Sequence, residues 1–233
     1  MIDDWTSYAI ADFIPFTAEV YVRLLERVGE SYWPLHVASV ALGLFILWCA
    51  WTRRLRRAGL LLAIVVAWVA VVFVSGPYAE LNWAGRWLGF AWLVTAGLLA
   101  LFAAFPGPTP VKRVNALPRV LGTGLAVFGM LGYPLIGLLV GHGAMAAETF
   151  GLHADPTAVA MLGIALMLWT GLRLWLVALV PLLWCLLSGL TLQALDIAWF
   201  AVPLAAAALA LVGLVAAVVE GQRFVLSRGS SGR

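Results

Sequence analysis

The sequence predicts an all-α, polytopic membrane protein with about seven transmembrane helices. Two observations carry this prediction: 64% of the residues are hydrophobic while only 11% are charged, and the apolar residues lie in long segments. Soluble domains are about half apolar and a quarter charged. A segment of about 17–25 apolar residues can cross the hydrocarbon core of a bilayer. The composition therefore argues against a water-soluble domain and favours a helical bundle inside lipid.

Seven apolar segments reach or approach this length. They cover residues 34–51, 58–75, 86–105, 120–141, 157–172, 174–192 and 197–219. Between the fifth and sixth, we expect a tight turn near Thr170-Gly171-Leu172-Arg173; one continuous helix there would reduce the count to six. The chain accordingly divides into an N-terminal segment, 1–33, a transmembrane bundle, 34–220, and a tail, 221–233, whose end resembles a linker or tag remnant.

The charged residues sort to two sides of the predicted bundle. Short cytoplasmic loops are enriched in Lys and Arg. If the Arg53–Arg57 loop is cytoplasmic, alternation of the spans places most other basic loop residues inside and these acidic residues outside: Glu80, Glu148, Asp155 and Asp196. We therefore expect the N-terminus outside and the C-terminus inside, in the cytoplasmic (inner) membrane of a bacterium. The basic residues indicate topology, and no nucleic-acid partner is expected.

The N-terminal segment is too polar to form a span and predicts an amphipathic helix instead. Thr17 is a suitable N-cap for a helix over residues 18–28, because its hydroxyl can accept a backbone N–H of the first turn. Val20, Leu24 and Val28 fall on one face of this helix. We expect it to lie at the outer membrane interface.

Glycine and proline residues within the spans predict close helix packing and kinks. Gly137 and Gly141 are four residues apart, a spacing that lets two helices approach closely. Pro134 and Pro181 lie inside the fourth and sixth spans, where each removes a backbone hydrogen bond. These four positions are predicted to shape the packing of the bundle.

Several functions are disfavoured by residues that the spans lack. No lysine occurs in any predicted span, which excludes a retinal Schiff base, and no ionisable residue falls near a span centre, which argues against a proton-coupled pump. Cys49 and Cys185 lie in apolar runs and do not form a CxxC site. No recognisable catalytic motif is present, so an enzyme is not the preferred interpretation and no catalytic residue is assigned.

Polar residues of the outer loops form the candidate site. A substrate or ion site is predicted from residues of the second and third outer loops: Tyr78, Glu80, Asn82, Arg86, Glu148 and Asp155. All three histidines, His36, His142 and His153, fall on the same side. Imidazole together with carboxylate suits a divalent transition metal. Loop hydrogen bonding explains the same residues, and the sequence leaves the identity of any cofactor open.

Several short segments resemble a family of bacterial multi-pass membrane proteins known only as a domain of unknown function. They are Pro15-Phe16-Thr17-Ala18-Glu19 with Tyr32-Trp33-Pro34, Tyr78 to Asn82-Trp83-Ala84, Tyr133-Pro134 with Gly141-His142, Phe150-Gly151 with Asp155-Pro156-Thr157, and Pro181-Leu182-Leu183-Trp184. In this order they cover most of residues 13–200. The family resemblance implies a cysteine before the Pro-Thr pair, where this chain has Asp155, a harder metal ligand. It implies no activity.

The preferred function from sequence is a permease for a small solute or cation, with a polar site at the outer face. The alternative is a non-catalytic interaction or scaffold subunit of a membrane complex. A membrane enzyme or a cofactor- or metal-binding protein is the least favoured class. The expected partners are the lipid bilayer and either a second copy of the chain or another subunit of a membrane complex.

Overall fold

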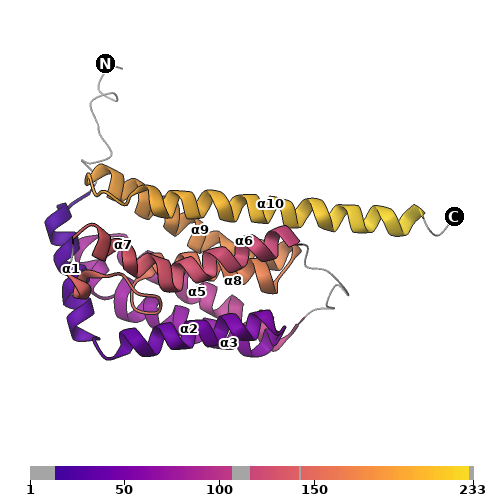
Figure 1. Cartoon of the computed structure of the whole chain (residues 1–233), viewed down its shortest axis with the longest axis horizontal. Helices are drawn as coiled ribbons and strands as arrows, with labels where there is room; N and C mark the ends of the chain where they lie inside the picture. The colour runs from indigo at the N-terminus through magenta and orange to yellow at the C-terminus, as the bar shows by residue number, and fades with distance from the viewer. Residues whose placement is uncertain (1–13, 107–115, 142, 231–233) are drawn as a thin grey trace, which may run out of the picture.

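A computed structural model of the chain describes residues 14–106, 116–141 and 143–230, with backbone alone at residues 116 and 220–230. These residues form helices and connecting turns (Figure 1). The elements are α1 (Ala18–Ser31), α2 (Leu35–Trp51), α3 (Leu55–Val69), the π-helical turn η3 (Ala70–Val74), α4 (Pro77–Leu81), α5 (Gly85–Ala104), α6 (Ala116–Val127), the π-helical turn η4 (Phe128–Gly132), α7 (Tyr133–Leu139), the 3₁₀ turn η5 (Ala144–Ala146), α8 (Ala154–Leu168), α9 (Gly171–Ala194) and α10 (Ala201–Ser230).

The all-helical, polytopic fold class is confirmed. Within the described residues, five helical segments are long and apolar enough to cross a membrane, or up to six if the bent pair α1–α2 is one span. Each predicted span corresponds to helical structure, but α2 has 17 residues and α8 only 15. The structure also separates the fifth and sixth predicted spans, because α8 ends at Leu168 and α9 begins at Gly171. The number of actual crossings stays a prediction.

Helix α1 lies across one end of the bundle, as Figure 1 shows, and turns by 87° into α2. The Thr17 hydroxyl accepts the Val20 N–H at 3.4 Å, which confirms the predicted N-cap. Leu24 and Val28 are buried, whereas Val20 is 39% exposed. The buried face instead includes Tyr21 and Leu25, so it is rotated slightly from the predicted stripe. We call the end of the bundle that α1 covers the polar end.

Helix α8 is the centre of the bundle. All of its residues are buried, and it contacts α2, α3, α6, α9 and α10. Small residues allow this close packing: a Cβ at Gly163 would collide with the Gly122 carbonyl oxygen of α6, and a Cβ at Gly129 would lie 2.6 Å from the Pro156 carbonyl oxygen. Because neighbouring helices cover α8 on every side, residues at its N-terminus are buried as well.

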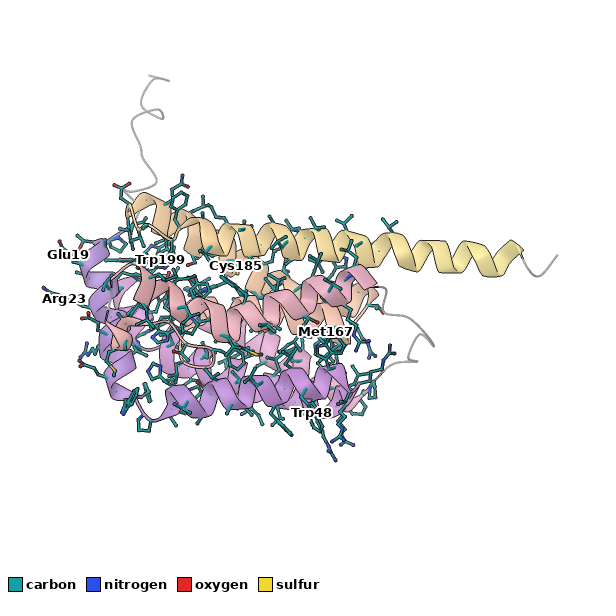
Figure 2. The ribbon with its side chains drawn as sticks, in the orientation of Figure 1. Glu19, Arg23, Trp48, Met167, Cys185 and Trp199 are labelled. Carbon is teal, nitrogen blue, oxygen red and sulfur yellow. The ribbon has the colours of Figure 1, made fainter. Side chains whose placement is uncertain are left out.

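The opposite end of the bundle carries arginine side chains packed on aromatic rings. Arg119 lies over the ring of Trp51 at 4.1 Å, and Arg54 lies over Trp48 at 4.4 Å. Figure 2 shows Trp48 and Met167 toward this end, and Glu19, Arg23 and Trp199 at the polar end. The predicted sorting of basic and acidic loops to opposite sides of a membrane stays a prediction, as does the sidedness of the two ends.

The residues predicted to shape packing occupy distinct positions. Pro134 lies in the first turn of α7, directly after the π-helical turn η4. A Cβ at Gly137 would lie 3.4 Å from Ala147, an ordinary van der Waals contact, so the following loop packs on this position without requiring a glycine there. Gly141 has a φ of +84° with open space around it, which suits a turn after the helix. Pro181 is buried inside α9.

Candidate functional site

Asp155 lies at the centre of a buried hydrogen-bond network at the polar end. It occupies the first turn of α8 and is 2% exposed. Its Oδ2 accepts the Tyr133 hydroxyl at 3.0 Å and the Ser188 hydroxyl at 2.6 Å, and its Oδ1 accepts the Trp184 indole N–H at 2.7 Å. Three neutral donors from α7 and α9, together with the N-terminus of α8, stabilise a negative charge on this carboxylate.

Glu148 is a second buried carboxyl group near this network. It is 4% exposed and lies in the segment that connects η5 with α8. Burial raises the pKa of Glu148 well above its usual value, and the nearby Asp155 raises it further, while a hydrogen bond with Trp199 opposes the rise. Burial and the nearby Asp155 therefore favour the protonated form of Glu148.

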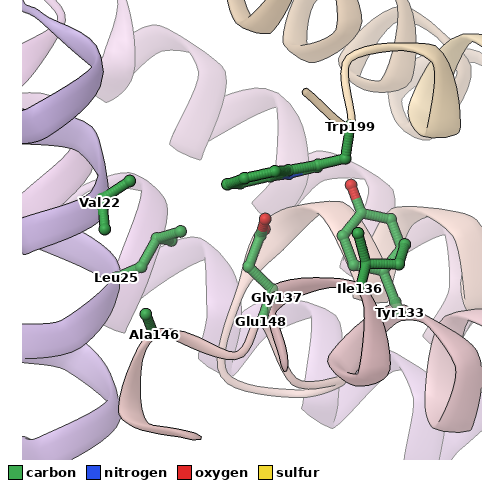
Figure 3. Close-up of a pocket in the computed structure, with 8 residues that line it drawn as sticks. All are labelled: Val22, Leu25, Tyr133, Ile136, Gly137, Ala146, Glu148 and Trp199. Carbon is green, nitrogen blue, oxygen red and sulfur yellow. The ribbon is translucent and has the colours of Figure 1, made fainter. Parts of the chain in front are cut away.

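Glu148 and Tyr133 both line a small cavity. The space that the centre of a water molecule could occupy in it is about 10 Å³, close to the minimum needed to hold one water. Figure 3 shows the Glu148 carboxyl and the Tyr133 hydroxyl facing the space beside the Trp199 indole. Val22 and Leu25 of α1 close the cavity from the other side. Tyr133 thus borders this cavity while it hydrogen-bonds Asp155.

An open groove of about 490 Å³ adjoins this cavity. Val22 and Trp199 line both spaces, so these two side chains form the partition between them. The groove lies between α1 and the start of α10, and its charged lining residues are Glu19, Arg23, Glu26 and Asp196. Three carboxylates against one guanidinium give the groove an excess of negative charge, which attracts cations.

Two of the histidines lie together beside the network. The ring centroids of His36 and His153 are 6.4 Å apart. His36 Nε2 donates to the Gly29 carbonyl oxygen at 3.2 Å, and its Nδ1 lies 2.8 Å from the Thr149 hydroxyl. Through these bonds His36 ties α1 to the segment before α8.

His153 is completely buried, and its Nδ1 accepts the Thr149 N–H at 3.0 Å. Burial, and then the neighbouring His36, lower the pKa of His153 to about 3. His153 is therefore neutral at physiological pH. His142, the third predicted metal ligand, lies outside the described residues. Among the residues with described positions, no group of three or more His, Cys, Asp or Glu side chains could hold a metal ion.

The other candidates from the second outer loop divide into two pairs. Tyr78 is buried against Trp184, with ring centroids 5.2 Å apart, and its hydroxyl accepts the Asn82 amide at 3.2 Å. These two residues therefore lie beside the network. Glu80 and Arg86 are exposed and lie outside it.

The residues that complete the network were not identified directly from the sequence. The candidate set lacked Tyr133, Trp184, Ser188 and Trp199, which bond or adjoin the two carboxyl groups. One signal was present: Trp184 and Ser188 are four residues apart, which places both on one face of a helix. Nothing in the sequence indicated that this face is turned toward Asp155.

Comparison with known proteins places the chain in a family but adds no activity. No curated protein and no solved structure matches it. A family described as of unknown function, DUF6064, matches residues 18–224. This range includes every residue of the buried network. Because the match covers most of the chain, the protein belongs to the DUF6064 family of unknown function.

Proposed function

We propose that the protein is a permease for a small cation, with Glu148 and Asp155 as its binding groups at the polar end, which faces outward. The observation that supports this most directly is the burial of both carboxyl groups among neutral donors. A carboxyl group buried among neutral partners is costly to keep charged, so it is stabilised by taking up a proton or by binding a cation. Ionisable groups inside membrane-embedded bundles commonly belong to ion pathways.

The spaces around these carboxyl groups suggest a route. A cation would enter the negatively charged groove and pass the partition formed by Val22 and Trp199. It would then reach Glu148 in the small cavity, and Asp155 behind the Tyr133 hydroxyl. Because the cavity is close to the size of one water, the site suits a small ion rather than a larger organic solute. Movement of α1 away from the start of α10 would separate Val22 from Trp199 and open a passage from the groove to the cavity.

The proposal is tested with the purified protein in proteoliposomes. Uptake of alkali cations, ammonium and protons is measured under an imposed membrane potential, with empty vesicles as the reference. We expect the protein to pass at least one of these ions, and Glu148→Gln to reduce the rate by about tenfold or more. Glu30→Gln is the matched control, because Glu30 is an exposed carboxylate on α1. Rates equal to those of empty vesicles for every ion would refute the proposal.

A further inference from the structure

We propose that the ion this site exchanges is a proton, which Glu148 and Asp155 share and pass between them through the Tyr133 hydroxyl. This inference rests on the proposed function and names the substrate of that site. It follows from three observations: two buried carboxyl groups with unequal hydrogen bonding, a tyrosine that bonds Asp155 and borders the same cavity as Glu148, and an open groove beside that cavity.

Glu148 and Asp155 share one proton because of their charge. Two carboxylates buried close together cannot both stay ionised, because each charge loses its hydration and repels the other. Asp155 receives three hydrogen bonds from neutral donors, and Glu148 is bonded by Trp199. The negative charge therefore rests on Asp155 and the proton on Glu148. The elevated pKa of Glu148 agrees with this assignment.

The proton is transferred from Glu148 to Asp155 by way of Tyr133. Tyr133 donates its proton to Asp155 Oδ2 across 3.0 Å, and the same residue borders the cavity that Glu148 faces. When Glu148 releases its proton to a water in the cavity, that water passes a proton to the Tyr133 oxygen, while the Tyr133 proton moves to Asp155. Glu148 becomes a carboxylate, Asp155 becomes an acid, and Tyr133 and the water are unchanged. One proton has moved, and no oxidant or reductant is required.

Other titratable groups face this pair from the surrounding elements. They are Tyr21 of α1, Tyr78 of α4, Tyr133 of α7 and Cys185 of α9, with Glu19, Arg23, Glu26 and Asp196 in the groove beyond the partition. The phenols and the thiol are neutral at physiological pH. The groove carboxylates give the approach from solvent toward Glu148 an excess of negative charge. Glu148 is therefore the group at which a proton from outside would first enter the buried network.

Infrared difference spectroscopy of the reconstituted protein tests where the proton resides. At neutral pH, we expect the carbonyl stretching band of a buried protonated carboxylic acid, and we expect Glu148→Gln to remove it. Glu30→Gln should retain the band, because Glu30 is exposed to solvent and lies outside the buried network. The inference is overturned if the wild-type protein lacks the band, or if the band persists unchanged in Glu148→Gln.

Proton flux tests the transfer through Tyr133. Proteoliposomes containing a pH-sensitive dye should acidify under an imposed potential, and Tyr133→Phe should slow this on the order of 100-fold while leaving the infrared band in place. Alkali cation uptake without proton movement would overturn the inference and leave the proposed permease intact. Failure to pass any cation would refute the proposed permease itself.

Discussion

Substitution of Asp155 by Ala and by Asn separates the hydrogen bonding of this side chain from its charge. Asp155→Ala removes the acceptor for the Tyr133 hydroxyl, the Trp184 indole and the Ser188 hydroxyl. Ser188 lies within α9 and can redirect its hydroxyl to a backbone carbonyl of the preceding turn. The other two donors stay buried, at a cost of about 1–3 kcal/mol each, so we expect a loss of about 2–6 kcal/mol.

Asp155→Asn should behave differently, because an amide can satisfy all three neighbours. Its carbonyl oxygen can accept the Trp184 N–H, and its NH₂ group can donate to the hydroxyl oxygens of Tyr133 and Ser188, which accept as well as donate. We therefore expect the stability of Asp155→Asn to stay within about 1 kcal/mol of the wild type.

The assay is reversible unfolding in mixed micelles. Sodium dodecyl sulfate is titrated into protein held in a mild detergent, and unfolding is followed by tryptophan fluorescence and by circular dichroism. The expected order is wild type and Asp155→Asn together, with Asp155→Ala clearly lower. Equal stability of the Ala and Asn variants would mean that the donors around Asp155 do not depend on it, contrary to the hydrogen bonds described above.

Three further predictions concern packing, pH and capping. Gly163→Ala should destabilise the protein, because its Cβ would meet the Gly122 carbonyl oxygen. Gly124→Ala should be neutral or stabilising by about 0.5–1 kcal/mol, because open space surrounds that position. The same unfolding assay compares the two variants, and equal effects would contradict the packing of α6 on α8. The pKa of His153 is about 3 in the folded protein, against an ordinary value of 6.5. Between these two pH values the unfolded chain therefore binds more protons than the folded protein. The free energy of unfolding should fall as the pH drops below 6.5, by up to about 1.4 kcal/mol per pH unit. His153→Gln should lack this component in melting curves recorded across that range, and an identical pH profile for both proteins would count against the burial of a neutral His153. Thr17→Ala should lower the free energy of unfolding by about 1 kcal/mol, because it removes the N-cap of α1. Thr17→Ser is the control, because serine keeps the capping hydroxyl. Equal stability of Thr17→Ala and the wild type would contradict the capping bond.

Much of the fold could be predicted because membrane helices are specified by local composition. The apolar segments, the Thr17 cap and the break between α8 and α9 are each encoded within a short stretch of sequence. The buried face of α1 was harder to predict, because Tyr21 and Leu25 extend the buried surface beyond the predicted stripe of aliphatic residues.

The site was only partly predictable because it depends on contacts between distant segments. Asp155 and Glu148 were expected in an outer loop, but both are buried, Asp155 in the first turn of the central helix α8 and Glu148 in the segment before it. A helix that is apolar on all faces carries no amphipathic pattern from which to read its place in a bundle. Tyr133 and Trp184 reach Asp155 across 22 and 29 residues of sequence, and no local spacing encodes such convergence.

The burial of these carboxyl groups also changes the interpretation of the sequence. The absence of ionisable residues near span centres argued against proton coupling. The structure describes a buried carboxylate in the first turn of α8 and a second one in the preceding loop, at the end of the bundle rather than its middle. A chain can therefore satisfy the hydropathy pattern of an inert bundle and still carry charge-bearing groups out of contact with water.

Whether the buried carboxylate takes part in ion movement is measured by the cation flux of Asp155→Asn in proteoliposomes, beside wild type and Glu30→Gln. This variant is expected to keep the hydrogen bonds around Asp155 while losing its charge. If the buried carboxylate binds the transported ion, Asp155→Asn will fold like the wild type and its flux will fall to the level of empty vesicles. Wild-type flux through a folded Asp155→Asn protein would contradict the account.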